Sequence, residues 1–193
     1  MNTESFFRWC VDTLFPPSEG ALLVRNTTIH TLTPRPQSID GVTHLLSFKD
    51  ARVRACIHEA KFSGNTRAQR LLAYVLETHL KDRKVCIVPI PLSKKRLRER
   101  GYNQVARIAH YTHFPVHEKA LSRTKHTTPQ TDLPREARIE NVRNIFASTG
   151  KYIYGKHVVL LDDVVTTGST LREAQKALAH ANPASITCIA MAH

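Results

Sequence analysis

The sequence predicts an α/β fold that is doubly wound, with a mainly parallel sheet and helices on both faces. Short continuous apolar runs alternate along the chain with segments of helical periodicity, which is typical of a parallel sheet buried on both sides. The 193 residues suffice for one sizeable domain and a short accessory segment, and a hydrophobic content of 41% is compatible with a folded core. We therefore expect an N-terminal helix and irregular arm over residues 1–40, and the α/β domain over residues 41–193.

The N-terminal part carries few periodic signals. Residues 5–14 are predicted to form a short helix that Pro16 and Pro17 stop. Residues 18–40 contain further prolines and several threonines, which predict an irregular arm or short strands around Leu22–Val24.

The α/β domain is predicted to begin with a strand over residues 42–48. Asp50 is a suitable N-cap for the helix after it, and a turn at Gly64–Asn65 leads into a longer helix with apolar residues at intervals of three and four. The later elements come in this order: a strand over 85–90, a helix over 94–109 bent or broken at Gly101, a short strand over 116–121, a polar excursion over 122–141, a strand over 158–161, a helix over 168–182 and a final strand over 185–191.

The strongest functional signal is the run from Val158 to Leu171, where an apolar strand leads into two carboxylates and then into small or hydroxyl-bearing residues. Ligands of open α/β sheets bind at the carboxyl ends of the strands, where Asp162 and Asp163 stand. Backbone N–H groups at the start of the next helix can surround a phosphate, and Gly168 lets the backbone approach it closely. Together these features suit one ligand that carries a phosphate and vicinal hydroxyls.

Three other interpretations of this run compete with that one. A Walker A loop requires a lysine after its last glycine, and Gly168 is followed by Ser169. An acidic pair at a strand end also occurs in magnesium-dependent phosphoacceptor pockets, but such a pocket does not need the hydroxyl-rich loop. The third is an ordinary strand and helix cap with solvated acids, which the complete strand, acid, loop and helix context disfavours.

A second anion-binding motif comes after the earlier buried strand. Pro89 and Pro91 flank Ile90 and stiffen the turn, and Ser93 opens a helix whose first turn directs N–H groups and lysines toward a nearby anion. The competing interpretation is a basic helix on the surface.

The run from Val158 to Leu171 resembles the 5-phosphoribosyl-1-pyrophosphate (PRPP) signature of the type I phosphoribosyltransferases. The chain also resembles the ComF family, which is linked to DNA uptake in natural transformation. The resemblance is carried by the motif Pro-Ile-Pro-Leu, by Arg-Gly-Tyr-Asn-Gln after it, and by Lys61–Gly64, Leu121–Thr124 and Gln130. Many ComF relatives carry a four-cysteine zinc ribbon after a Phe-Pro-Pro sequence. Phe15–Pro17 is not followed by such cysteines, so no zinc site is expected.

The resemblance implies the type I phosphoribosyltransferase fold and assigns roles at the two motifs. Asp162 and Asp163 would meet the ribose hydroxyls and Mg²⁺, which is the expected cofactor together with PRPP. The 5-phosphate would be bound by Val165, Thr166, Thr167, Gly168, Ser169 and Thr170. The pyrophosphate would be bound by Ile90, Pro91, Leu92, Ser93 and Lys94. No acceptor or general base is evident, so turnover by a phosphoribosyltransferase and PRPP binding without turnover both stay open, and catalytic residues are unknown.

The charge of the chain favours anionic partners. Lys and Arg outnumber Asp and Glu by 28 to 16, for a net charge of +12. With the family resemblance, this predicts binding of single-stranded DNA and contact with proteins of the DNA-uptake machinery, and Tyr111 and Phe114 could add stacking surfaces. The candidates for DNA contact are Lys95, Arg96, Arg98, Arg100, Tyr102, Arg138 and Arg143.

The cysteines and the apolar segments indicate where the protein works. Cys10, Cys56, Cys86 and Cys188 are scattered, and none forms a metal or redox pair. We predict a reduced, cytoplasmic protein. The partly apolar N-terminal run is too short and too interrupted to cross a bilayer, so no transmembrane segment is expected.

Overall fold

A parallel sheet forms the centre of the computed structural model, which describes residues 16–81, 83–124, 145–150 and 152–193. The sheet has five strands in the order β1-β2-β7-β6-β3, and only β1 runs antiparallel to its neighbour. The strands are β1 Gln37–Ile39, β2 Val42–Leu46, β3 Cys86–Pro89, β6 His157–Val164 and β7 Ser185–Ala192. The predicted α/β class and parallel sheet are confirmed. The helix predicted over residues 5–14 lies outside the described residues.

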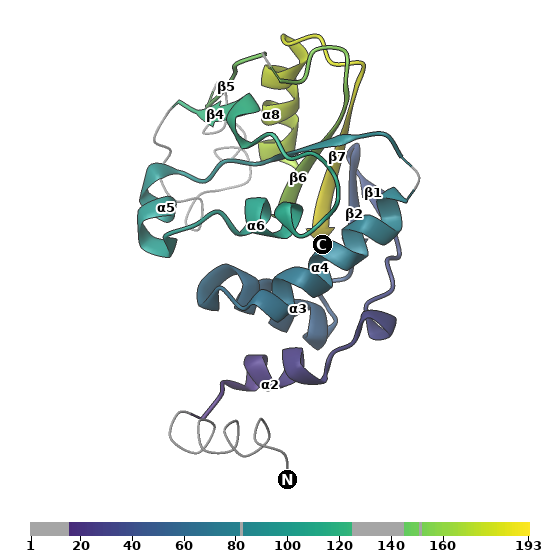
Figure 1. Cartoon of the computed structure of the whole chain (residues 1–193), viewed down its shortest axis with the longest axis vertical. Coiled ribbons are helices and arrows are strands. Elements are labelled where there is room, and N and C mark those ends of the chain that lie inside the picture. Colours follow the sequence, from purple (N-terminus) through teal and green to yellow (C-terminus); the bar gives the residue numbers. More distant parts are fainter. Residues whose placement is uncertain (1–15, 82, 125–144, 151) are drawn as a thin grey trace.

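Helices cover both faces of this sheet, as predicted (Figure 1). Alternate residues of β6 point to opposite sides, so Val159 and Leu161 belong to one core and Val158 and Leu160 to the other. The first core is closed by α2 Glu19–Asn26, α3 Ala51–His58, α4 Thr66–Leu80 and α6 Gln104–His110. The second is closed by α8 Ser169–Ala179 and a small antiparallel sheet of β4 Leu121–Arg123 and β5 Phe146–Ser148.

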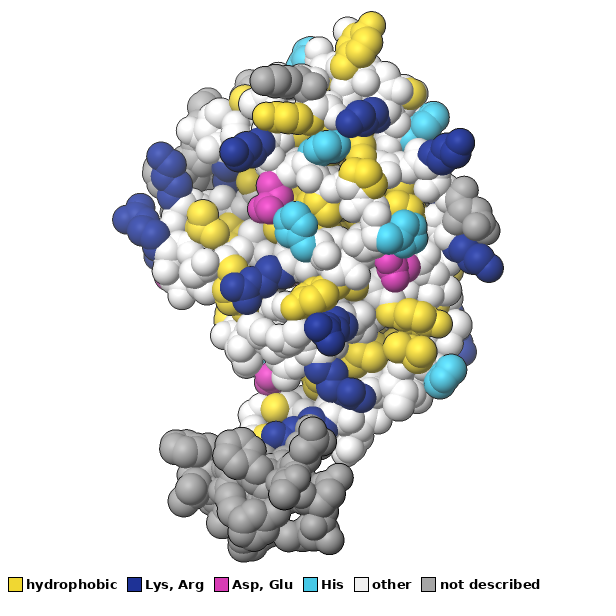
Figure 2. All heavy atoms as spheres, viewed as in Figure 1, with side chains coloured by type: hydrophobic (Ala, Val, Ile, Leu, Met, Phe, Trp, Pro, Cys, Tyr) yellow, Lys and Arg dark blue, Asp and Glu magenta, His cyan; other side chains and the backbone are white. Residues whose placement is uncertain are grey.

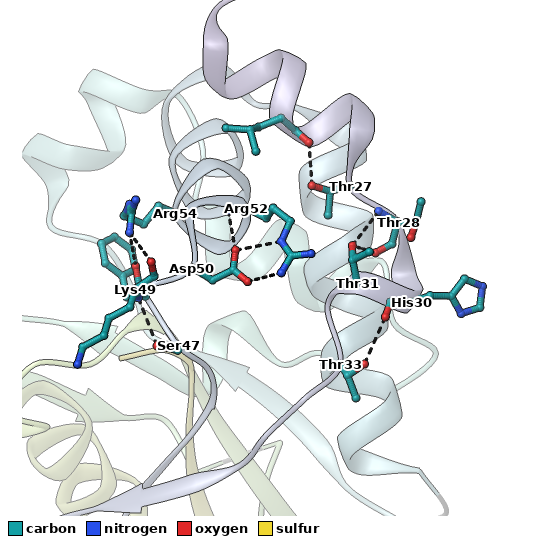
Figure 3. Close-up of polar contacts among 12 residues, drawn as sticks. Thr27, Thr28, His30, Thr31, Thr33, Ser47, Lys49, Asp50, Arg52 and Arg54 are labelled. Carbon is teal, nitrogen blue, oxygen red and sulfur yellow. Dashed lines mark hydrogen bonds and ion pairs between the residues drawn. The ribbon is translucent and has the colours of Figure 1, made fainter.

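The N-cap predicted at Asp50 is confirmed. Its Oδ1 accepts a hydrogen bond of 2.8 Å from the backbone N–H of Arg52, and the Arg52 guanidinium donates to Oδ2 at 2.7 Å (Figure 3). The hydrogen bond from the Arg52 side chain holds the pKa of Asp50 below its usual value. Arg54 donates to the carbonyls of Phe48 and Lys49, so the turn before α3 is fixed on both sides.

The prediction of short strands around Leu22–Val24 is wrong, because that segment is part of the helix α2. Ser18 caps the helix by accepting from the N–H of Ala21, and only Val24 of the helix is buried. Arg67 closes the other end by donating to the carbonyls of Val24 and Thr27. The sequence signal was weak because the apolar residues of α2 are contiguous, and Leu22 and Leu23 stay exposed.

A second correction concerns residues 116–121, which were predicted to form a strand. Val116 makes a single bridge to Ile87, and a 3₁₀ turn over Glu118–Ala120 (η3) precedes β4. Ala120 and Leu121 are adjacent and both buried, so this segment lacks the alternation of buried and exposed residues that a strand would show. The predicted break at Gly101 is confirmed, because it adopts φ +74° between α5 Lys94–Arg100 and α6.

Candidate functional site

The two predicted anion loops leave the sheet side by side. Strands β3 and β6 are parallel neighbours, with Pro89 paired to Leu161, and the N–H of Ile90 donates to the Leu161 carbonyl at 2.8 Å. The Asn103 side chain donates to the Ile90 carbonyl at 2.9 Å while its oxygen caps α6. The loops at 90–94 and 165–170 are therefore brought together at the carboxyl edge of the sheet, where the sequence places a ligand.

Asp162 lies on the α8 side of the sheet. It lines a small hollow of about 30 Å³. All the remaining residues that line this hollow lie in the continuous segment 164–171, which contains the hydroxyl-rich loop. Its Oδ1 accepts a 2.9 Å hydrogen bond from the backbone N–H of Asp163. Burial raises the pKa of Asp162 well above its usual value, and the neighbouring charge of Asp163 raises it further. A bound cation would relieve both penalties.

Asp163 turns to the opposite side of the sheet, as the alternation of β6 requires, and is 9% exposed. Its Oδ2 accepts a 2.8 Å hydrogen bond from Nε2 of the buried Gln104 and lies 3.7 Å from Nζ of Lys61. Its Oδ1 accepts from the N–H of Val164 at 2.8 Å. Both oxygens of Asp163 are therefore engaged by the protein, whereas Asp162 faces the hollow.

Gln104 and Lys61 were not assigned a role from the sequence. Both stand in short runs that resemble the ComF family, Lys61–Gly64 and Arg100–Gln104. No spacing rule connects them to an acid on β6, so only the three-dimensional structure reveals the contact. In the sequence, only their position in these two ComF-like runs points to a functional role for Gln104 and Lys61.

The loop from Val165 to Thr170 has the backbone geometry that the sequence predicts. Gly168 adopts φ +67°, and a Cβ placed there would lie 3.0 Å from Nη1 of Arg172 and 3.2 Å from Cγ2 of Val42. The hydroxyls of Thr167 and Ser169 are 3.0 Å apart. The Arg172 guanidinium donates to the Thr167 carbonyl at 2.6 Å and lies 3.8 Å from Asp40, which ties the loop to the turn between β1 and β2.

The pyrophosphate candidates form a turn that ends in α5. Ser93 caps this helix by accepting from the N–H of Arg96, as predicted. Ile90 is buried, residues 91–93 are half-buried and Lys94 is exposed. The basic side chains of Lys95, Arg96 and Arg98 project into solvent.

The predicted DNA contacts are only partly brought together. Arg100 is half-buried, and Tyr102 donates its hydroxyl to the Ala60 carbonyl at 3.0 Å. Phe114 is 7% exposed and therefore offers no open ring face, which removes it as a stacking surface. Arg138 and Arg143 lie outside the described residues, as does most of the excursion predicted over 122–141. Figure 2 shows Lys and Arg side chains spread over the visible face, with few acids among them.

The residues at the sheet edge fit a magnesium ion better than a softer metal. Asp162 supplies a carboxylate oxygen, Asp163 lies beside it, and the hydroxyls of the loop are also oxygen donors, which is the ligand type that Mg²⁺ prefers. Within the described ranges, no three His, Cys, Asp or Glu side chains gather as a metal cluster. No helix of the same ranges is long and apolar enough to cross a bilayer.

Comparison with known proteins identifies the domain. The phosphoribosyl transferase domain family matches residues 99–193, which contain the acidic pair and the hydroxyl-rich loop. Competence protein F of Haemophilus influenzae is 34% identical over 63% of this chain and 59% of its own length. The chain belongs to the ComF family. The predicted type I phosphoribosyltransferase fold is confirmed with it.

Two other ComF relatives agree. The DNA utilization protein YhgH of Escherichia coli K12 is 32% identical over 67% of this chain and 62% of its own length. Competence protein ComFC of Bacillus subtilis is 33% identical over 50% of this chain and 39% of its own length. The chain thus spans about three fifths of the length of the first two ComF relatives.

Proposed function

We propose that this ComF protein binds PRPP together with Mg²⁺ at the carboxyl edge of β6 and β3. One observation carries the proposal: Asp162 and the loop from Val165 to Thr170 line a single hollow, next to the second anion loop at 90–94. A carboxylate facing a phosphate-type loop is unfavourable for a bare phosphate, because the two would repel each other. It is favourable for a ligand that also presents hydroxyls or a cation.

The three parts of PRPP match three parts of the site. The N–H groups and hydroxyls of 165–170 would bind the 5-phosphate at the start of α8. Asp162 would accept hydrogen bonds from the ribose hydroxyls, and the turn at 90–94 would bind the pyrophosphate. Asp163, held by Gln104 and Lys61, would contribute its negative charge. Its backbone N–H would also position Asp162, whose Oδ1 accepts the 2.9 Å hydrogen bond from it.

Magnesium would neutralise the charge that the pyrophosphate brings to the acidic edge. The raised pKa of Asp162 supports this part of the proposal, because a carboxylate that is buried beside another acid gains when a cation approaches.

We further propose that the protein acts in DNA uptake, in the cytoplasm, and that it binds single-stranded DNA and proteins of the uptake machinery. The names of the competence and DNA utilization relatives support the role in uptake. The net charge of +12 supports an anionic partner. Cys56, Cys86 and Cys188 are free buried thiols, which is compatible with a reducing compartment.

Thermal unfolding in the presence of ligand fragments tests the site. We expect PRPP with Mg²⁺ to raise the melting temperature, and ribose 5-phosphate and pyrophosphate to raise it less, because each fills part of the site. Asp162→Asn should remove the effect of PRPP, whereas Glu77→Gln, the same chemical change on α4, should leave it intact. Equal shifts for both variants would contradict the proposal.

The role in uptake is tested separately. Expression of the chain in Haemophilus influenzae lacking competence protein F should restore transformants, and the Asp162→Asn variant should restore fewer. Pyrophosphate release from PRPP in the presence of candidate acceptors measures whether turnover accompanies binding.

A further inference from the structure

An exposed aromatic ring stands close to the acidic pair. Phe62 is 59% exposed and lies in the π-helical turn Glu59–Ser63 (η2) that comes after α3. Two cations lie near its ring, with Nζ of Lys61 at 5.5 Å and the guanidinium carbon of Arg100 at 5.2 Å from the ring centre, and the ring of His58 is centred 4.7 Å away. The ring and Arg100 come from segments far apart in the sequence.

A second aromatic residue fixes this arrangement. Tyr102 donates its hydroxyl to the Ala60 carbonyl at 3.0 Å, and the guanidinium of Arg107 stacks on its ring at 3.9 Å. Gly64 ends the turn with φ +61°, and a Cβ added there would lie 3.5 Å from both Arg107 and Tyr102. We call Lys61, Phe62, Arg100, Tyr102 and Arg107 the Phe62 patch.

The patch is positively charged and retains its charge. Arg100 donates to the side-chain carbonyl of Gln104 at 3.0 Å, which is a neutral acceptor. Lys61 lies 3.7 Å from Asp163, but that acid is only 9% exposed and also accepts a hydrogen bond from Gln104. The solvent-facing part of the patch therefore combines an aromatic face with three cations.

We propose that the Phe62 patch is the surface that binds single-stranded nucleic acid, with a base stacked on Phe62 and adjacent phosphates on Lys61, Arg100 and Arg107. An exposed aromatic ring among cations complements a strand whose bases are unstacked and whose backbone is anionic. A duplex hides its base faces inside the stack, so it can use the cations of the patch but not its ring.

The patch adjoins the PRPP site through Lys61 and Asp163. A strand bound there lies beside the carboxyl edge of β6 without occupying the hollow in front of Asp162. The inference rests on the proposed role in DNA uptake for its partner, and it does not depend on PRPP binding.

Fluorescence anisotropy of the whole chain with a labelled oligothymidylate of about 20 nucleotides tests the proposal. We expect Phe62→Ala to bind about tenfold more weakly, because one stacked base is lost. Phe62→Trp keeps the stacking face and should bind like the wild type. Tyr154→Ala removes another exposed ring, 75% exposed, from a distant turn and should change nothing.

Salt dependence provides a second measurement. Lys61→Ala should lower the slope of log affinity against log salt by about 0.7, the value for one phosphate contact of a single strand. Unlabelled duplex should compete less well than the single strand with the wild type, and equally well with Phe62→Ala.

The outcomes separate this proposal from PRPP binding. Phe62→Ala should keep the thermal shift with PRPP, and Asp162→Asn should keep the affinity for the oligonucleotide. Wild-type affinity of Phe62→Ala for the strand, or an equal loss in Tyr154→Ala, would overturn the patch. Failure of the wild-type protein to bind the oligonucleotide would overturn it as well, and would leave the PRPP site standing.

Discussion

Gln104 on α6 donates a 2.8 Å hydrogen bond to Asp163 at the end of β6, and both side chains are buried. The bond joins the helix beyond the pyrophosphate candidates to the strand that carries the acidic pair. It explains how a carboxylate can stay nearly inaccessible in this position, because its two oxygens have donors from the protein.

The first prediction concerns this contact. Gln104→Leu leaves Asp163 buried with one donor fewer, and should lower the free energy of unfolding by about 2 kcal/mol, as for other hydrogen bonds to charged groups. Urea denaturation measures the loss. In an Asp163→Ala background the same substitution should cost much less, and equal costs in both backgrounds would show that the bond contributes nothing.

The second prediction concerns the charge of Asp162. Because its folded pKa is raised above the unfolded value, the folded state binds its proton more tightly. Stability from this group is therefore complete below the unfolded pKa of about 4 and falls as pH rises toward the folded pKa. Asp162→Asn removes this half-buried charge and should stabilise the protein at pH 7 by about 1 kcal/mol.

The pH dependence supplies the check on that prediction. Melting temperatures of the wild type and of Asp162→Asn should converge as pH falls below about 4, where Asp162 is protonated in both states. A difference that is the same at acid and neutral pH would contradict the assignment of the effect to the charge.

The third prediction concerns the turn into α8. Gly168→Ala should destabilise the protein by more than Gly155→Ala, although their φ angles of +67° and +66° are almost equal. Both changes cost about 1 kcal/mol for a side chain in the left-handed region. Only Gly168 of the two also meets side chains, Arg172 at 3.0 Å and Val42 at 3.2 Å. Urea denaturation of both variants measures the two losses in free energy of unfolding. Equal losses would show that the contacts with Arg172 and Val42 cost nothing.

The fourth prediction concerns the thiols. Burial raises the pKa of Cys56 to about 12 and that of Cys188 to about 11, so little thiolate forms at pH 8. Iodoacetamide should leave both unmodified in the folded protein and alkylate them in urea, as mass spectrometry of peptides would show. Fast labelling of either residue under native conditions would contradict the core assignment.

The fold could be predicted from the sequence where local signals coincide. Val158–Leu161 is apolar, Asp50 is a capping residue placed directly before a helical pattern, and Gly101 interrupts another, so these elements are observed where they are expected. Around Leu22–Val24 the apolar residues are contiguous rather than periodic, and in Val116–Leu121 three polar residues separate Val116 from Ala120 and Leu121. Neither pattern has a period that chooses between helix, turn and strand.

The candidate site could be predicted only in part for a related reason. Asp162 and the loop 165–170 form one continuous stretch of chain, and parallel strands bring the loop at 90–94 to the same edge. The contacts of Asp163 with Gln104 and Lys61 join residues on separate helical segments, and no sequence period predicts them. The contact of Phe62 with Arg100 likewise joins two separate segments of the chain.

Calorimetric titration with PRPP tests the central claim most directly, performed with Mg²⁺ and with chelator, on the wild type and on the double variant Asp162→Asn, Asp163→Asn. We predict saturable heat for the wild type with Mg²⁺, a weaker response with chelator, and none for a double variant that circular dichroism shows to be folded. Binding heat that the double substitution leaves unchanged would contradict the claim that this acidic edge binds PRPP.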